Sequence, residues 1–221
     1  MSIKDHLNTI KSELPKGVTL VAVSKTKPVS ELMEAYDAGQ RIFGENKVQE
    51  MTDKWEQMPK DIQWHMIGHV QRNKVKYMAE YVTLVHGVDS LKLLKELNKH
   101  GKIHDRVIDC LFQIKIAEED SKFGMDVQEV KDILKSEAFN AFENVKVVGL
   151  MGIATFTEDE GQVRSEFQFL KETFDAMQSH VSDNFKPSIL SMGMSGDYHI
   201  AIDCGSNMIR LGSSIFGARN Y

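Results

Sequence analysis

The sequence predicts an α/β fold, a single (β/α)₈ barrel (TIM barrel) with an extra helix at its N-terminus. Two observations predict it. Short apolar, β-branched runs alternate with amphipathic helical patterns along the chain, and eight such runs can be counted. Parallel strands need crossover connections, which the intervening helices supply. Eight units fit a compact closed barrel in 221 residues, with an open doubly wound sheet as the alternative on pattern alone.

The extra helix comes first and is expected to end near Pro15, because Ile3, Leu7, Ile10 and Leu14 recur at helical spacing before it. The predicted strands are, in order, 18–23, 41–44, 62–67, 83–87, 107–114, 145–151, 188–191 and 208–211. Helical patterns follow Pro28 and fill 48–57, 91–100 and 127–134, and the longest helix carries Phe167, Leu170, Phe174 and Met177 on one stripe. No linker or repeat interrupts this pattern, so residues 1–221 are predicted to form one domain.

The composition excludes several classes of protein. With 42% hydrophobic and 27% charged residues, the chain can bury a core and is not intrinsically disordered. Its two cysteines, Cys110 and Cys204, are too few for a disulfide scaffold. With 27 basic and 32 acidic residues the net charge is −5, which disfavours nucleic-acid binding over a broad surface but leaves room for a local anion pocket.

The chain has no apolar run near the ~18 residues of a membrane span. Its N-terminus, Met-Ser-Ile-Lys-Asp-His, lacks the apolar core of a secretory signal. We therefore expect a cytoplasmic protein without membrane association.

Binding and catalytic groups of a barrel gather at the carboxyl ends of its strands. Most predicted strand ends carry a glycine, which permits tight turns and close backbone approach to a ligand; the fifth does not. The segments after the last two strands, 191–196 and 210–214, combine glycine and serine. Backbone N–H groups and hydroxyls of this kind suit a phosphate, and barrels commonly bind phosphate after strands seven and eight. The alternative is that these segments are ordinary turns.

Two cations stand out near the predicted barrel mouth. Lys25 closely follows the first strand, where partial desolvation would favour the neutral amine that forms a Schiff base with an aldehyde. The alternative is a solvated loop lysine, a role that suits Lys27 better. Arg210 lies inside the apolar eighth strand and must find a partner there, either a carboxylate or a ligand heteroatom.

Other chemistries are poorly supported. The eight histidines show no tight metal spacing; His65 and His69 lie on a strand-to-loop path rather than on one helix face. The segment around Ser195 comes close to a hydrolase nucleophile motif but lacks the full G-x-S-x-G pattern. No phosphate-binding P-loop and no G-x-G-x-x-G motif occurs.

Several ordered blocks resemble the pyridoxal phosphate homeostasis protein family, whose fold is similar to the N-terminal barrel of alanine racemase. The resemblance runs along most of the chain, in residues 21–28 (VAVSKTKP), 43–50 (FGENKVQE), 64–74 (WHMIGHVQRNK), 149–151 (GLM), 190–195 (LSMGMS) and 210–217 (RLGSSIFG). Blocks of this length in the same order are far more specific than any short motif.

The resemblance implies that pyridoxal 5′-phosphate is the cofactor. Lys25 would hold it as a Schiff base, Arg210 would face the pyridine nitrogen, and the phosphate would be bound by Ser195, Gly212 and Ser213. Asn46, Met192 and the loop of His69 would line the pocket. Two positions depart from the commonest family pattern, His199 and Asn207, and are expected to affect only local details of the pocket.

The resemblance implies a protein that holds the cofactor and takes part in its homeostasis, with apo-enzymes as recipients. The first alternative is an amino-acid racemase, which needs a second acid/base group. The chain ends at Tyr221 after the eighth barrel unit, so the tyrosine-bearing β domain of alanine racemases is not expected, and neither is their dimer; we expect a monomer. The second alternative is a cofactor-free Schiff-base aldolase that uses Lys25 on a phosphorylated sugar.

Overall fold

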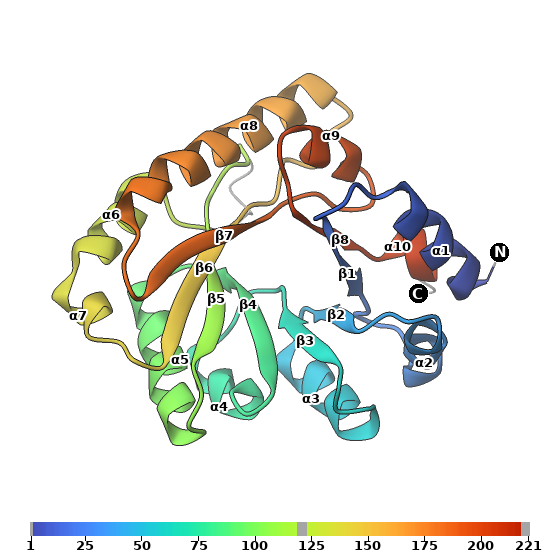
Figure 1. Ribbon diagram of the computed structural model, residues 1–221, viewed down its shortest axis with the longest axis horizontal. Coiled ribbons are helices and arrows are strands. Elements are labelled where there is room, and N and C mark those ends of the chain that lie inside the picture. Colours follow the sequence, from blue (N-terminus) through green and yellow to red (C-terminus); the bar gives the residue numbers. More distant parts are fainter. Residues whose placement is uncertain (1, 119–122, 218–221) are drawn as a thin grey trace.

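Eight parallel strands close into a barrel in the computed structural model, which describes residues 2–118 and 123–217 (Figure 1). The barrel closes because β8 pairs with β1, with Val21 opposite Arg210. This confirms the barrel and excludes the open sheet. The strands are β1 (Thr19–Val23), β2 (Ile42–Glu45), β3 (Gln63–Met66), β4 (Val82–Val88), β5 (Ile108–Gln113), β6 (Val145–Met151), β7 (Phe185–Ser191) and β8 (Met208–Leu211).

The helices surround the barrel (Figure 1). The predicted extra helix is α1, which starts at a capping box formed by Ser2 and Asp5 and packs against α2 and α10. The helices are α1 (Ile3–Glu13), α2 (Val29–Asp37), α3 (Val48–Gln57), α4 (Val75–Met78), α5 (Leu91–Ile103), α6 (Val127–Lys135), α7 (Glu137–Asn140), α8 (Glu160–Met177), α9 (Tyr198–Asp203) and α10 (Ser213–Phe216), with short 3₁₀ helices at Arg72–Lys74 and Gln178–His180. Within the described ranges, no helix combines the length and apolar character that crossing a membrane requires.

The alternation of side chains along the strands separates two apolar layers. An inner cluster fills the barrel and includes Val21, Leu84, Leu111, Met151 and Met208. A larger outer cluster fills the space between the strands and the helices. On β1, Leu20 and Ala22 belong to the outer cluster and Val21 to the inner one, as the two-residue period of a strand requires.

Strand β7 differs most from its predicted bounds, since it starts at Phe185 and contains Pro187. A proline lacks the N–H that a central strand needs for its hydrogen-bond ladder. The structure tolerates it because β7 pairs with β8 only at Ser191 and Met208, so most of that side of β7 has no strand ladder.

Asn207 completes the barrel at this weakly paired seam. Its side-chain oxygen accepts from the Leu190 N–H at 2.7 Å, and its Nδ2 donates to the Ser188 carbonyl at 2.7 Å. Its own carbonyl accepts from the Thr19 N–H at 2.8 Å. The expectation that Asn207 affects the pocket is therefore wrong: the residue precedes β8, at the end of the barrel where the strands begin, and replaces missing ladder bonds.

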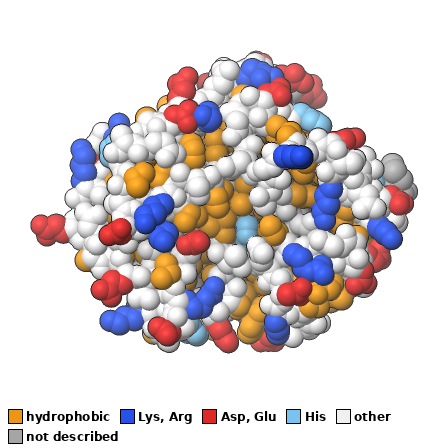
Figure 2. Space-filling view, viewed as in Figure 1, with side chains coloured by type: hydrophobic (Ala, Val, Ile, Leu, Met, Phe, Trp, Pro, Cys, Tyr) orange, Lys and Arg blue, Asp and Glu red, His pale blue; other side chains and the backbone are white. Residues whose placement is uncertain are grey.

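The surface shown in Figure 2 is charged at its periphery and apolar at its centre. Lysine, arginine and carboxylate side chains alternate around the edge, and hydrophobic side chains surround one histidine in the central hollow (Figure 2). The mixed charge agrees with the small net charge of the chain.

Candidate functional site

Lys25 lies in the turn that follows β1, and α3 holds the residues on both sides of it. Lys54 Nζ donates to the Ser24 carbonyl at 2.8 Å, and the Thr26 N–H donates to Glu50 Oε1 at 2.6 Å. Thr26 has φ of 65°, a left-handed conformation that a β-branched residue rarely adopts without support. The turn that carries Lys25 is therefore fixed by two side chains of one helix.

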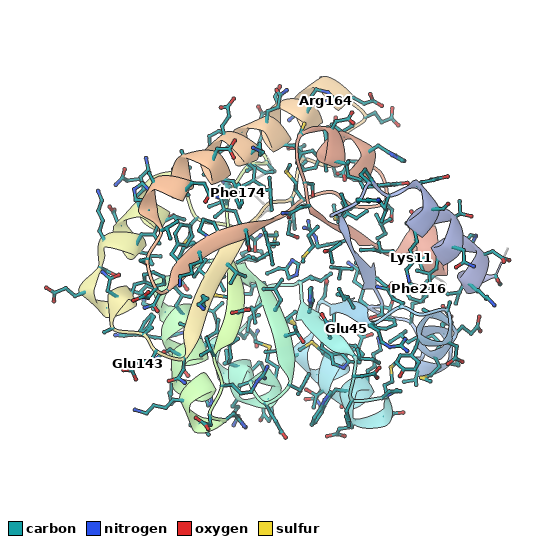
Figure 3. The ribbon with its side chains drawn as sticks, in the orientation of Figure 1. Lys11, Glu45, Glu143, Arg164, Phe174 and Phe216 are labelled. Atoms are coloured by element: carbon teal, nitrogen blue, oxygen red, sulfur yellow. The ribbon has the colours of Figure 1, made fainter. Side chains whose placement is uncertain are left out.

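We call Ser24, Glu45, Glu50 and Lys54 the ionic cluster. Lys54 Nζ lies 2.7 Å from Glu45 Oε1 and 2.7 Å from Glu50 Oε1, and Ser24 Oγ donates to Glu45 Oε1 at 2.6 Å. Glu45 lies at the end of β2 (Figure 3), and its side chain is fully buried. This burial raises the pKa of its carboxyl, while Lys54 and Ser24 oppose the rise. Glu45 Oε2 has no hydrogen-bond partner among the described residues.

We call Arg210, Ser191, His86 and His65 the inner chain, because hydrogen bonds join them inside the barrel. Arg210 Nη1 donates to Ser191 Oγ at 2.6 Å, and Nη2 donates to the Gly152 carbonyl at 3.1 Å. Ser191 Oγ lies 3.1 Å from His86 Nδ1, and His86 Nε2 lies 3.0 Å from His65 Nδ1. The chain crosses from β8 and β7 to β4 and β3.

The inner chain carries its charge on Arg210. Within the described residues, Arg210 forms no ion pair, so a carboxylate partner is not its anchor. Burial lowers the pKa of its guanidinium to about 10, partly offset by Asp197, and the group stays protonated at neutral pH. Burial also lowers the pKa of His65 to about 3 and that of His86 well below its ordinary value, so both imidazoles are neutral.

The loops after β7 and β8 meet at the same end of the barrel. The Gly212 N–H donates to Ser195 Oγ at 3.3 Å, which joins the two loops. Ser213 and Ser214 open α10, and the first N–H groups of a helix have no partner within it. A Cβ on Gly212 would lie 3.2 Å from the Val23 carbonyl, so this loop runs close against the end of β1. The three predicted phosphate ligands therefore lie together, beside the strand that leads to Lys25.

Comparison with known proteins places the chain in a family. The profile of the alanine racemase N-terminal domain family matches residues 1–220. The pyridoxal phosphate homeostasis protein of Haemophilus influenzae is 36% identical over 234 residues, which covers 100% of this chain and 98% of that protein. The protein of the same name from Aquifex aeolicus is 37% identical over 203 residues, covering 91% and 87% of the two chains. The chain belongs to the pyridoxal phosphate homeostasis protein family.

Solved structures agree with this family. PipY of Synechococcus elongatus PCC7942, solved with pyridoxal phosphate bound, is 32% identical, with a TM-score of 0.89 and coverage of 98% of this chain and 100% of that one. Alanine racemase of Clostridium difficile 630 is 16% identical, with a TM-score of 0.79 over 100% of this chain and 60% of that one. The second likeness shows a shared fold alone.

For this family member, the structure brings most of the predicted site residues to one end of the barrel. Asn46, partly exposed, follows β2, and its carbonyl would lie 2.5 Å from a Cβ on Gly68; a Cβ on Gly87 would in turn lie 2.7 Å from the Gly68 carbonyl. Gly68 and Gly87 therefore lack a side chain because the backbone of the neighbouring strand end packs against them, and not because a ligand does. His69 Nδ1 lies 3.0 Å from Asp89 Oδ2, with the ring stacked on Phe123.

The structure does not bring two of the singled-out side chains to this site. Met192 is fully buried in the outer cluster, because it follows the inward-facing Ser191 and alternation turns it toward the helices. His199 is exposed on α9, where its ring lies 3.8 Å from that of Tyr198. Tyr221 lies outside the described residues.

Sequence reasoning missed the ionic cluster and most of the inner chain. His86 offered a signal, since it interrupts an apolar strand as Arg210 does. Lys54 offered none, because a lysine on an amphipathic helix is normally solvated. Its burial becomes visible only when α3 packs against the ends of β1 and β2.

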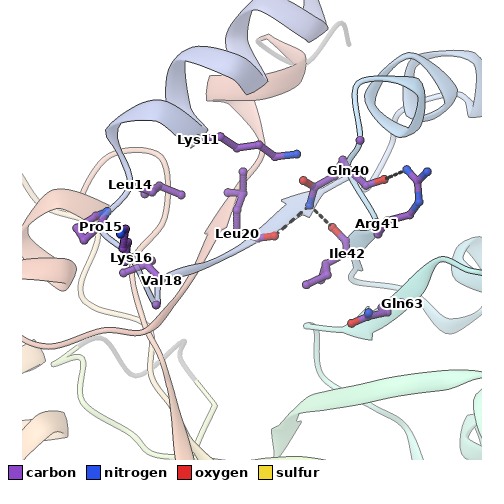
Figure 4. A pocket seen from close by; sticks show the side chains of 12 residues that line it. Lys11, Leu14, Pro15, Lys16, Val18, Leu20, Gln40, Arg41, Ile42 and Gln63 are labelled. Carbon is purple, nitrogen blue, oxygen red and sulfur yellow. Dashed lines mark hydrogen bonds between the residues drawn. The ribbon is translucent and has the colours of Figure 1, made fainter.

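A separate pocket of about 430 Å³ lies at the opposite end, where β1, β2 and β3 begin (Figure 4). Gln40 Nε2 donates there to the Leu20 carbonyl at 3.0 Å and to the Ile42 carbonyl at 2.8 Å, and Lys11 extends across the opening. Burial lowers the pKa of Lys11, with a smaller effect from Arg41. None of the predicted site residues lines this pocket, so it is distinct from the site at the mouth.

Proposed function

We propose that this chain binds pyridoxal 5′-phosphate at the barrel mouth as a Schiff base on Lys25, and takes part in the homeostasis of this cofactor and its delivery to apo-enzymes. One observation carries the proposal. Because β8 pairs in parallel with β1, with Val21 opposite Arg210, the segments beyond both strands lie side by side. Lys25, Arg210 and the Gly212–Ser213 loop therefore come from adjacent parts of one barrel end.

The residues present suit each part of the cofactor. The cofactor supplies an aldehyde that condenses reversibly with an amine, and Lys25 supplies the amine on a turn that the ionic cluster holds in place. Ser195 and Ser213 supply hydroxyls, and the loop of Gly212 and Ser213 supplies backbone N–H groups at the start of α10, for the phosphate; the Gly212 N–H, which donates to Ser195 Oγ in this structure, would turn to the phosphate on binding. Asn46 and the His69 loop line the opening. Because the Met192 side chain is fully buried, only its backbone is available to line the opening.

Arg210 decides what kind of chemistry this arrangement favours. A guanidinium cannot accept a proton, and it keeps its own protons at neutral pH, so it donates to an unprotonated ring nitrogen. An unprotonated ring withdraws electrons weakly and gives little stabilisation to a carbanion on a bound amino acid. This supports holding the cofactor over racemising a substrate.

Labelling of Lys25 tests this proposal directly. The protein is incubated with pyridoxal phosphate, reduced with borohydride and mapped by mass spectrometry. We expect an imine absorption band and a cofactor-sized adduct on Lys25, both lost in Lys25→Ala and retained in the control Lys27→Ala. An adduct on another lysine, or none, would overturn the proposal, and a cofactor-free aldolase predicts no such band.

A second measurement separates the carrier from the racemase. Loaded protein is incubated with single amino-acid enantiomers and, separately, with an apo-enzyme that needs pyridoxal phosphate. We expect reactivation of the apo-enzyme without enantiomer interconversion. Interconversion faster than ~1 per second would show a racemase instead.

A further inference from the structure

The inner chain crosses the barrel beneath the site and is screened from solvent along its length. His86 and Ser191 are fully buried, and His65 and Arg210 are each 3% exposed. Its members come from strands β3, β4, β7 and β8, which no local sequence pattern connects. Buried polar groups are expected to have a hydrogen-bond acceptor for each N–H or O–H hydrogen that they carry.

The chemistry of its two ends sets the direction of the hydrogen bonds. The Arg210 guanidinium donates and never accepts, so Ser191 Oγ accepts from Nη1. In the described parts of the chain, the other partner of Ser191 Oγ is His86 Nδ1. If His86 Nδ1 carried a proton, the buried Ser191 hydroxyl hydrogen would have no acceptor, at the cost of an unsatisfied group.

We propose that Ser191 and His86 are positioning residues for Arg210, in a chain that donates from Arg210 to Ser191, from Ser191 to His86 Nδ1, and from His86 Nε2 to His65 Nδ1. Both histidines are then the Nε2–H tautomer. A proton added to His65 Nδ1 would face the N–H of His86 Nε2. A proton added to His86 Nδ1 would face the hydroxyl hydrogen of Ser191.

The inner chain matters for Arg210 because it holds one edge of the guanidinium group in place. Ser191 Oγ and the Gly152 carbonyl hold Nη1 and Nη2, which sets the plane of the group and leaves its other N–H groups for a ligand. That this ligand is the ring nitrogen of pyridoxal phosphate rests on the proposed function; the order of the chain does not.

The order is tested on the ligand-free wild-type protein. Labelling with ¹⁵N-histidine and long-range ¹H–¹⁵N correlation spectra report which ring nitrogen carries the proton, with His65→Gln and His86→Gln used for assignment. We expect Nε2–H for both residues at pH 7. Nδ1–H at His86, or a doubly protonated ring at either residue, would overturn the order.

The positioning role is tested with a matched pair of buried serines on the same seam. Ser191→Ala removes the anchor of Arg210, whereas the control Ser206→Ala removes a 4% exposed hydroxyl that bonds to the carbonyls of Leu190, Met192 and Met208. In ligand-free protein, we expect separate, slowly exchanging Arg210 Nη signals in the wild type and Ser206→Ala, and a single averaged signal in Ser191→Ala. Averaged signals in the wild type would overturn the role.

The same pair is then titrated with pyridoxal phosphate. We expect Ser191→Ala to raise the Kd about tenfold and to shift the absorption maximum of the bound cofactor, as loss of one hydrogen bond to a charged group implies. Ser206→Ala should leave both unchanged. An equal effect of both variants would show a merely structural serine. If the wild type does not bind the cofactor, the proposed function fails. The two measurements on ligand-free protein still test the hydrogen-bond order of the inner chain and the positioning of Arg210.

Discussion

The ionic cluster, buried except for the partly exposed Glu50, and the fully screened inner chain both adjoin the barrel mouth, yet they are built in opposite ways. The ionic cluster places one ammonium, on Lys54, between two carboxylates at 2.7 Å each. The inner chain contains one guanidinium, on Arg210, that is joined to a serine, a carbonyl and two neutral histidines. In the ionic cluster the buried cation is neutralised by carboxylates. In the inner chain the buried cation stays charged and is stabilised by hydrogen bonds to neutral groups.

The difference follows from the side of the strand on which each group lies. Ser24 and Glu45 face the helices, where α3 supplies counter-ions and thereby fixes the backbone around Lys25. Arg210 lies inside the barrel and, among the residues that the structure describes, forms no ion pair, and a buried cation without an ion pair is costly unless it is hydrogen-bonded. The ionic cluster holds the turn around Lys25, whereas the inner chain holds the charged guanidinium of Arg210 by hydrogen bonds to neutral groups.

Loss of Lys54 should break the ionic cluster with the largest effect. Lys54→Met leaves Glu45 buried beside Glu50 without a cation, and we expect a loss of about 3–5 kcal/mol in the free energy of unfolding. Urea denaturation followed by circular dichroism measures this. Glu45→Gln in the same background should restore part of the loss, because it removes the unpaired charge.

The control for Lys54 is Lys171→Met, which breaks an exposed pair with Asp175 on α8. We expect about 0–1 kcal/mol there. A similar small loss for Lys54→Met would contradict the role of the ionic cluster.

The free energy of unfolding should change with pH in opposite directions for the histidines of the inner chain and for Glu45 of the ionic cluster. The folded-state pKa values of His65 and His86 are lowered, so their contribution is complete above the unfolded value of about 6.5 and is lost as the pH falls. We expect roughly 1.4 kcal/mol per pH unit for each histidine below pH 6.5. The raised pKa of Glu45 acts in the opposite sense, with a contribution present below about pH 4.3 and lost as the pH rises.

Urea unfolding between pH 5 and 7 measures the histidine slope, and extending the series to pH 4 tests the opposite sign expected for Glu45. His65→Gln should reduce the acid-side slope by one histidine, because glutamine can still accept from His86 without titrating. The exposed His199→Gln is the control and should leave the slope unchanged. An unaltered slope in His65→Gln would show that the inner chain is not the source.

The smallest expected effect concerns the turn itself. Glu50→Ala removes the acceptor of the Thr26 N–H, and we expect the affinity for pyridoxal phosphate to fall about threefold, equivalent to ~0.7 kcal/mol. Glu50→Gln keeps an oxygen acceptor and should behave like the wild type in an absorbance titration. Wild-type affinity in Glu50→Ala would mean that the turn holds its shape without α3.

Reasoning from sequence worked best where a residue's role depends on its distance from a strand end. Lys25, Arg210 and the Ser195 and Gly212–Ser213 segments were placed at one barrel end from strand order, and the structure puts them there. Sequence reasoning could not foresee which face a side chain takes. The Met192 side chain is buried in the outer cluster, so its predicted place in the pocket stays a prediction that concerns its backbone, and Asn207 is part of the barrel seam.

The sequence by itself determined the alternation of eight strands with helices, the family, and the cation and glycine–serine loops at the strand ends, because these depend on local pattern and chain order. Only the tertiary structure decided that Lys54 is a buried counter-ion and that His65, His86, Ser191 and Arg210 form one chain. The physical reason is that barrel closure and helix packing join residues far apart in sequence. Burial then changes what the same side chain does, from a solvated charge to a fixed partner.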